Sequence, residues 1–206
     1  MQSENQPAGQ RTFVDQARRN QLVDCAIEAI AQVGLARASL TEIGKRAGLS
    51  KAAVFYHFSG RDELVGEVVV TVLRRGAEYM AARMPERPTP PEELRAYIEA
   101  NVGYVAEHRD DVKVLVAIAV GFTDENGESK LRSDASVYEA SLAPLRDILS
   151  RGQADGYFGE FDTRTTAMTI RAAIDAIGPQ LTAVPGLDLA AYARDLVALF
   201  ERATAR

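Results

Sequence analysis

The sequence predicts an all-α protein of about nine helices. Apolar residues recur three and four positions apart through most of the chain, which is the spacing of a helix with one buried face. No segment of any length alternates apolar and polar residues as a half-buried strand would. Four prolines between residues 85 and 91 cannot continue a helix, and they therefore separate two helical regions.

The first region begins with a polar segment, residues 1–12, which we expect to be a flexible tail. A helix is predicted from Gln16 to Gly34, with a stripe of apolar residues at Leu22, Ala26, Ile30 and Val33. Arg18 and Arg19 lie near the start of this helix. They could contact the phosphates of a nucleic acid, or they could belong to a solvated face.

Residues 39–58 are predicted to form two short helices with a tight break between them. Ser39 and Glu42 have the spacing of a capping box at the start of the first helix. Gly48 can turn with a positive φ at the end of that helix, and Ser50 is a second N-cap. Two helices joined by a short glycine-containing turn form the helix-turn-helix plan, whose second helix enters the major groove of DNA.

The second of these helices has two different sides. Val54 and Phe58 are four residues apart and can pack on the first helix. The outward side then carries a cation, two small residues that permit close approach, and an amphipathic aromatic, namely Lys51, Ala52, Ala53 and Tyr56. Such a surface is suited to reading a DNA groove. Any short amphipathic hairpin could show the same pattern, so the segments around it also matter.

A longer helix is predicted from Arg61 to about Met84, with Ser59 as its cap and Asp62 at the capping-box position. The proline-rich segment that follows is the expected domain boundary. We therefore expect a DNA-binding domain over residues 13–84, containing the helix-turn-helix at 39–58, and a second domain over residues 85–206.

At this point the sequence resembles the tetracycline-repressor family of bacterial transcription regulators. The match runs from about Gln16 to Gly76 and consists of an ordered set of short motifs: Val33-Gly34, Ser39-Leu40-Thr41-Glu42-Ile43, Ala47-Gly48-Leu49-Ser50-Lys51, Val54-Phe55-Tyr56-His57-Phe58 and Arg61-Asp62-Glu63-Leu64. The resemblance implies that DNA contacts come from Thr41, Lys51, Ala52, Ala53, Tyr56, His57 and Arg61. Arg61 matches a phosphate-contacting lysine of the family.

Two positions depart from the family pattern. Phe55 stands where the family usually has a tyrosine whose hydroxyl contacts a phosphate, so that contact should be missing here. Thr41 stands where many members have an arginine, which changes the contacts expected from the first helix of the motif.

The resemblance also implies a homodimer that binds a palindromic operator, in which the last two helices of each copy pair into a four-helix bundle. Apolar stripes on the helices predicted at 162–181 and 187–205 are compatible with this interface. The residues concerned are Ile170, Ile174, Ile177, Leu181, Leu189, Leu196 and Leu199. The same stripes are equally compatible with a core inside one chain.

The family further implies a repressor that a small-molecule effector releases from its operator. The helix predicted to start at Pro90 has polar and aromatic residues at Tyr97, Asn101, Tyr104 and His108, beside its apolar side and away from its charged side. Burying such groups without partners is costly, so we expect them to line a mostly apolar cavity for an aromatic or lipophilic effector, together with Phe122, Tyr138, Arg171 and Asp175. Alternatively, the stripe packs on its neighbours, and the Arg171–Asp175 pair is a salt bridge one helical turn long.

The remaining segments are also predicted to be helical. Residues 110–123 are apolar nearly all round, which predicts a buried central helix. Residues 131–152 keep a helical register across Pro144, which predicts one kinked helix. Residues 162–181 and 187–205 are each predicted to form one further helix.

Composition and charge place limits on the function. The formal net charge of −5 divides into +2 for residues 1–62 and −7 for the rest, so the acidic total does not argue against DNA binding. No run of about 18 apolar residues predicts a membrane span, and the first ten residues lack the apolar centre of a signal peptide. The single cysteine, Cys25, suits the reducing cytoplasm.

Catalytic chemistry is not indicated by any motif. His108, Asp110 and Asp111 do not have a spacing that converges on one metal ion, and no glycine-rich phosphate loop or nucleophile elbow is present. We therefore expect no enzyme activity, no metal and no cofactor. Two other functional classes remain open: an all-α enzyme with an appended helix-turn-helix, and an adaptor whose helix-turn-helix binds protein instead of DNA.

Overall fold

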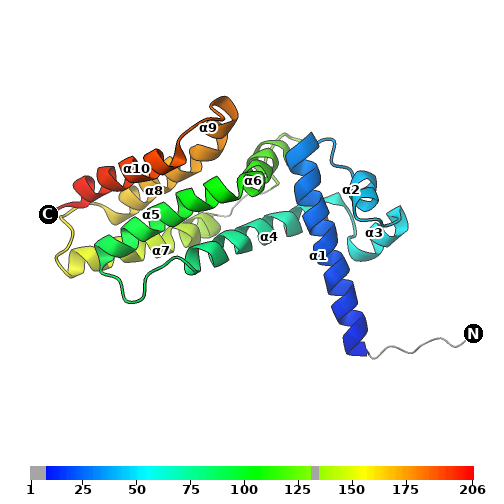
Figure 1. Ribbon diagram of the computed structural model, residues 1–206, viewed down its shortest axis with the longest axis horizontal. Helices are drawn as coiled ribbons and strands as arrows, with labels where there is room; N and C mark the ends of the chain where they lie inside the picture. Colours follow the sequence, from blue (N-terminus) through cyan, green and yellow to red (C-terminus); the bar gives the residue numbers. More distant parts are fainter. Residues whose placement is uncertain (1–7, 131–134) are drawn as a thin grey trace, which may run out of the picture. The chain divides into compact units, whose positions relative to one another are not determined.

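The computed structural model describes residues 8–130 and 135–206, and those residues form ten α-helices and no β-strand, apart from one isolated bridge between Thr123 and Ser129. The predicted all-α class is confirmed (Figure 1). Within the described residues no helix is long and apolar enough to cross a membrane. The chain divides into two compact units. The first unit runs to Leu73 and includes Lys113–Ser129, and the second consists of Arg74–Val112 and Lys130–Arg206.

This division differs from the single boundary expected at residue 85. The helices α4 (Arg61–Ala81) and α6 (Arg109–Gly121) each contribute residues to both units. The later part of α6 belongs to the first unit, where a Cβ atom on Gly121 would lie 3.4 Å from the Cδ2 atom of Leu35. The prolines therefore end a helix without ending a unit.

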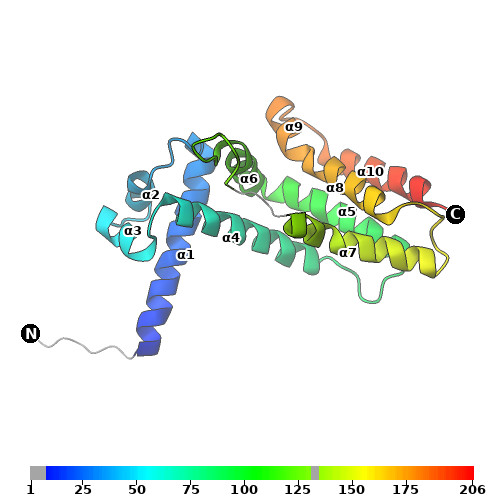
Figure 2. The same cartoon turned by 180° about the vertical axis from the view of Figure 1, so that it is seen from behind.

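The first unit is built on α1 (Ala8–Val33), α2 (Leu40–Arg46), α3 (Lys51–His57) and the first part of α4. Helix α1 begins at Ala8, inside the segment expected to be a tail. The short helices α2 and α3 lie beside α1 in both ribbon views (Figures 1 and 2). Buried apolar side chains from all four helices form the core, including Leu22, Ala26, Ile30, Ile43, Val54, Phe58, Leu64 and Val68.

Hydrogen bonds at the helix starts and a glycine in the turn separate α2 from α3. The Ser39 Oγ atom accepts a hydrogen bond from the Glu42 backbone N–H at 3.2 Å, and the Ser50 Oγ atom accepts one from Ala53 at 3.2 Å. The Glu42 carboxylate pairs with Arg46 at 3.0 Å, so only the serine half of the expected capping box forms. Gly48 has φ +66°, as expected for the turn.

The contact between α2 and α3 needs a glycine at a second position. A Cβ atom on Gly44 would lie 2.8 Å from the Cγ2 atom of Val54 and 3.2 Å from the Leu49 carbonyl oxygen. A larger residue would therefore push α3 away from α2, and the angle between the two helices depends on this glycine.

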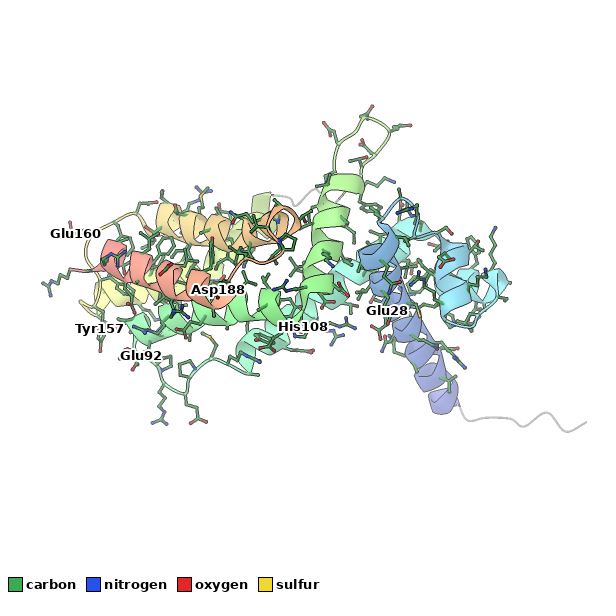
Figure 3. The ribbon with its side chains drawn as sticks, turned by 45° about the horizontal axis from the view of Figure 1, so that its top comes forward. Glu28, Glu92, His108, Tyr157, Glu160 and Asp188 are labelled. Carbon is green, nitrogen blue, oxygen red and sulfur yellow. The ribbon has the colours of Figure 1, made fainter. Side chains whose placement is uncertain are left out.

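The second unit is a bundle of α5 (Pro90–Glu107), α7 (Ala135–Ala154), α8 (Thr163–Asp175), α9 (Ile177–Ala183) and α10 (Leu189–Thr204). Thr89 and Glu92 form the capping box of α5, with Pro90 in its first turn. Figure 3 labels Glu92 at the start of α5 and His108 at its end. The bundle core includes Leu94, Ile98, Leu145, Leu149, Ile170, Ile174, Leu196 and Phe200.

Two predicted helices differ in the structure. The segment 162–181 is not one helix, because α8 ends at Asp175 and α9 begins at Ile177. Pro179 has no N–H to donate to the carbonyl of Asp175, and its ring crowds that carbonyl, so an unbroken helix is disfavoured there. The helix at 110–123 is not buried all round, since Val120 is 78% exposed while Val114 and Ile118 are buried.

Candidate functional site

The outward face of α3 presents the predicted DNA-contacting side chains. Lys51, Ala52 and Tyr56 are exposed, and Tyr56 is 74% exposed although it is a large aromatic. Val54 and Phe58 are buried on the opposite side of the helix, as expected. Of the other predicted contacts, Thr41 is exposed on α2, whereas Ala53 and His57 are half-buried.

Aromatic contacts hold side chains on this face. The Lys51 Nζ atom lies 5.8 Å from the centroid of the Phe55 ring. The rings of Tyr56 and His57 meet edge to face with centroids 5.0 Å apart. Phe55 is 46% exposed, so α3 carries two neighbouring aromatic side chains at its surface.

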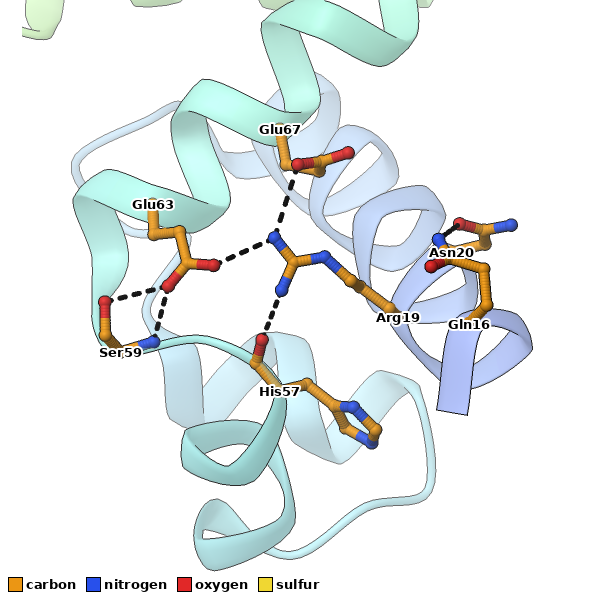
Figure 4. A network of polar contacts seen from close by, with 7 residues as sticks. All are labelled: Gln16, Arg19, Asn20, His57, Ser59, Glu63 and Glu67. Atoms are coloured by element: carbon orange, nitrogen blue, oxygen red, sulfur yellow. Dashed lines mark hydrogen bonds and ion pairs between the residues drawn. The ribbon is translucent and has the colours of Figure 1, made fainter. Parts of the chain in front are cut away.

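A network around Arg19 fixes the end of α3 (Figure 4). The guanidinium of Arg19 donates to Glu63 at 2.8 Å, to Glu67 at 3.3 Å and to the carbonyl oxygen of His57. It also lies over the ring of Phe58, 4.2 Å from the centroid. The hydrogen bond that Arg19 donates to the Glu63 carboxylate is the main reason that the pKa of Arg19 is raised. Arg19 therefore ties α1, α3 and α4 together, a structural role that was not expected from the sequence, and its contact with phosphate stays a prediction.

The start of α4 depends on Glu63. Its Oε2 atom accepts hydrogen bonds from the backbone N–H of Ser59 at 2.7 Å and from the Ser59 hydroxyl at 2.8 Å (Figure 4). The backbone N–H of Ser59 is the largest cause of the low pKa of Glu63, about 2. The prediction that Asp62 would fill this position was wrong, because α4 begins at Arg61 and Glu63 is its third residue.

Arg61 is held within the first unit. Its guanidinium donates to the carbonyl oxygen of Leu35, and the residue is half-buried. This predicted phosphate contact therefore also has a structural role. Arg18, by contrast, is exposed and donates to the nearby Gln21 side chain at 2.8 Å.

The polar stripe predicted on α5 is divided into two groups, each with partners inside the second unit. The first group surrounds Tyr104, whose hydroxyl donates to the Asp111 carboxylate at 2.8 Å. Asp111 is 5% exposed and also pairs with Arg75 at 3.4 Å. Burial first, and then the Asp111 carboxylate, raise the pKa of Tyr104. The His108 ring stacks on the Tyr104 ring at 4.6 Å, and Tyr79 meets both rings edge to face.

The second group joins α5 to α8. The Asn101 amide donates to the Tyr97 carbonyl at 2.8 Å and accepts from Arg171 at 3.2 Å. Arg171 also donates to Asp175 through its Nε atom at 2.9 Å. Burial tends to lower the pKa of Arg171, but the carboxylate of Asp175 outweighs it and the pKa is raised. These four residues are thus brought together, as a network of mutual hydrogen bonds.

The other predicted effector residues lie elsewhere. Phe122 is buried in the first unit, and the side chain of Tyr138 lies outside the described residues. A pocket of about 240 Å³ is present in the second unit, and its lining contains none of the predicted effector residues. It is formed by Tyr79, Arg83, Ala96, Glu99 and Ala100.

Most residues predicted for the dimer interface are core residues of a single chain. At most 7% of each side chain is exposed at Ile170, Ile174, Ile177, Leu189 and Leu196. These residues pack within the bundle, so they do not present their side chains to a second copy. Leu181 is half-buried, and Leu199 on α10 is 50% exposed.

Sequence reasoning missed Arg75, Tyr79 and Asp111 as partners of the α5 stripe. The only sequence signal was the seven-residue separation of Tyr104 and Asp111 across the end of α5, because the other contacts come from α4. Among the described residues no group of three or more His, Cys, Asp and Glu side chains is arranged to hold a metal ion.

Comparison with known proteins agrees with the geometry of the first unit. Residues 22–68 match the family described as bacterial regulatory proteins, tetR family. The HTH-type transcriptional regulator BetI 1 of Chromohalobacter salexigens is 35% identical over 85 residues, which make up 41% of this chain and 42% of that protein. The chain thus spans less than half of that relative's length.

Solved structures extend the likeness of fold to most of the chain. The fatty acid degradation regulator FadR from Bacillus halodurans superposes with a TM-score of 0.74 at 20% identity, covering 88% of this chain and 93% of that one. FadR from Bacillus subtilis in complex with stearoyl-CoA gives 0.74 at 21% identity, covering 87% and 96%. The family match is confined to residues 22–68, which contain the helix-turn-helix, so the likeness to the tetR family of bacterial regulatory proteins is carried by that domain.

Proposed function

We propose that this protein is a sequence-specific DNA-binding transcriptional regulator that places α3 in the major groove. The observation that carries the proposal is the outward face of α3, where Lys51, Ala52 and Tyr56 are exposed opposite the buried Val54 and Phe58. Ala52 permits close approach to the groove, and Lys51 and Tyr56 supply donors for phosphates and base edges.

The scaffold beneath this face favours binding without rearrangement. Ser50 caps the start of α3, and Arg19 holds the carbonyl oxygen of His57 at its end. A helix fixed at both ends presents its side chains in one orientation, which reduces the entropy lost on binding. The contacts of Arg61 to Leu35 and of Arg19 to Glu63 make these two arginines supports for the binding face.

We also propose that the protein acts as a homodimeric repressor on a palindromic operator in the cytoplasm. A twofold dimer places two copies of α3 on half-sites related by the helical repeat of DNA, roughly 34–36 Å per turn. Leu199 supports an interface that includes α10, because half of this large apolar side chain is exposed. Ile170 and Ile174, two of the buried residues of α8, would affect dimer formation only indirectly, by holding the surface of the bundle in position.

A small-molecule effector is the third part of the proposal, and we expect it to be aromatic or lipophilic. The similar fold of Bacillus subtilis FadR was solved with stearoyl-CoA, a lipophilic acyl compound. In this chain the polar groups of Tyr97, Asn101 and Tyr104 already have partners. An effector at this stripe would therefore have to replace those hydrogen bonds, for example between Arg171 and Asn101.

The test is selection of duplexes from a random pool by the full-length protein. We expect enrichment of an inverted repeat, and loss of that enrichment for the double variant Lys51→Ala/Tyr56→Ala. Arg95→Ala, an exposed arginine of the second unit, is the matched control and should enrich the same sequence. A folded wild-type protein that enriches no sequence would overturn the proposal, and retention of a protein partner instead would favour the adaptor function.

A further inference from the structure

Phe55 is the feature of α3 that a phosphate-binding role does not explain. Its side chain is 46% exposed, whereas that of Phe58, the residue that caps the end of α3, is 1% exposed. A phenyl ring has neither a donor nor an acceptor, so it can form no hydrogen bond to a phosphate or to a base edge. Leaving such a group in water forgoes the favourable free energy of burial, about 25 cal/mol per Å².

The major groove offers this ring one kind of partner. Among the groups that base pairs present there, the apolar one is the 5-methyl group of thymine, and phenylalanine is among the side chains that contact it. We propose that Phe55 reads a thymine methyl group in each half-site of the operator. This inference rests on the proposed function, and it adds a determinant of sequence preference.

The position of Lys51 indicates that the Phe55 ring lies on the part of α3 that we propose contacts DNA. Residues four apart on a helix share a face, and the Lys51 Nζ atom lies 5.8 Å from the centroid of the Phe55 ring. The two residues are about 6 Å apart along the helix axis at 1.5 Å per residue, and successive bases on one strand are about 3.4 Å apart. The thymine should therefore lie within about two base pairs of the group that Lys51 contacts.

The surrounding contacts give the ring a defined position. The end of α3 is tied to α1 by the bond from Arg19 to the His57 carbonyl, and the buried Val54 anchors the middle of the helix. A methyl group adds binding free energy only where the apolar surface opposite it is already held close. The network in Figure 4 supplies that support.

The test replaces thymidine in the operator by deoxyuridine, which removes only the 5-methyl group of the base. A selected operator is prepared with each thymine replaced in turn, symmetrically in both half-sites, and titrated with the full-length wild-type protein. At one position we expect a loss of affinity of about fourfold per half-site, or roughly 15-fold per operator, the size expected for one buried methyl-sized group at each half-site.

Variants assign that loss to Phe55. Phe55→Ala should bind the thymine and deoxyuridine operators equally at that position, whereas Phe55→Leu, which keeps an apolar side chain, should retain part of the difference. Tyr56→Ala should keep the full sensitivity to the methyl group. The salt dependence of binding should be the same for Phe55→Ala and wild type, since no phosphate contact is removed.

Two results would overturn the inference while leaving the proposed function intact. One is an operator in which no deoxyuridine replacement weakens wild-type binding. The other is a Phe55→Ala variant that retains the wild-type sensitivity at every thymine. If no sequence is enriched at all by the folded protein, the proposed function fails and this inference fails with it.

Discussion

Two rows of polar and aromatic residues, one on α3 and one on α5, look alike in the sequence and differ in the structure. Lys51 and Tyr56 on α3 are exposed, and the protein keeps them at its surface. Tyr104 and Asn101 on α5 are turned toward partners inside the second unit. The comparison shows that such a row indicates a binding face only where the rest of the chain leaves its polar groups to the solvent.

The largest effect on stability should come from a charged substitution in the core of the second unit. Ile174→Asp places a charge where 2% of the side chain is exposed, and we expect the protein to lose at least about 4 kcal/mol of unfolding free energy. Leu199→Asp should change that free energy by less than about 0.5 kcal/mol per chain, because Leu199 is half exposed. Urea denaturation measures the first effect, and sedimentation tests whether Leu199→Asp is a monomer.

A folded Ile174→Asp monomer would reverse this interpretation. It would mean that Ile174 faces a second copy and contributes little to the core of its own chain.

The next effect concerns the hydrogen bonds of the α5 row. Asp111→Ala removes the partner of the buried Tyr104 hydroxyl and of Arg75, and we expect a loss of about 2–3 kcal/mol in unfolding free energy. Glu125→Ala, at an exposed loop position, is the control and should cost less than about 0.5 kcal/mol. Equal losses for the two variants would show that the Tyr104–Asp111 bond does not stabilise the fold.

A smaller effect separates the two adjacent arginines of α1. Arg19→Ala should reduce the unfolding free energy by about 1–2 kcal/mol, because it removes the bonds to Glu63, Glu67 and His57. Arg18→Ala should be within about 0.5 kcal/mol of wild type. Both are measured by denaturation and by DNA titration at several salt concentrations. A reduced salt slope for Arg19→Ala would show that its guanidinium contacts phosphate instead.

The smallest effect is a pH dependence. The pKa of Glu63 is about 2 in the folded protein, below its ordinary value of 4.5. The stabilisation from its ionised form is therefore complete above about pH 4.5 and is lost as the pH falls toward 2. Glu63→Gln should flatten the fall in stability across this window, and Ser59→Ala should flatten it partly. An unchanged slope in Glu63→Gln would show that the Ser59 bonds do not persist in solution.

Much of the fold could be predicted from the sequence, because the determining signals are local. Ser50, Gly48 and the Thr89–Glu92 box act within a few residues, and the structure has helices where they predict them. The break at Ala176 was missed, since the apolar spacing continues through Pro179 and hides its effect on the hydrogen bonds.

The roles of individual site residues depended on contacts between distant segments. Arg18 and Arg19 are equivalent in sequence, and only the position of Glu63, 44 residues later, makes one of them structural. The apolar stripe that contains Ile174 has the same spacing whether this residue packs on α5 of its own chain or on a second copy. The spacing alone therefore could not separate a core residue from an interface residue. The row on α5 likewise depended on Arg75 and Tyr79, which come from α4 and have no periodic relation to that row in the sequence.

The most direct test of the account is one pair of titrations with the double variant Lys51→Ala/Tyr56→Ala. These side chains are exposed, so we expect an unfolding free energy within about 1 kcal/mol of wild type, at most about 0.5 for each surface substitution. We also expect the affinity for the selected operator to fall by at least about tenfold, with a salt slope reduced by about 1 for the lost lysine contact. A stable double variant that binds the operator as tightly as wild type would contradict the claim that α3 reads DNA.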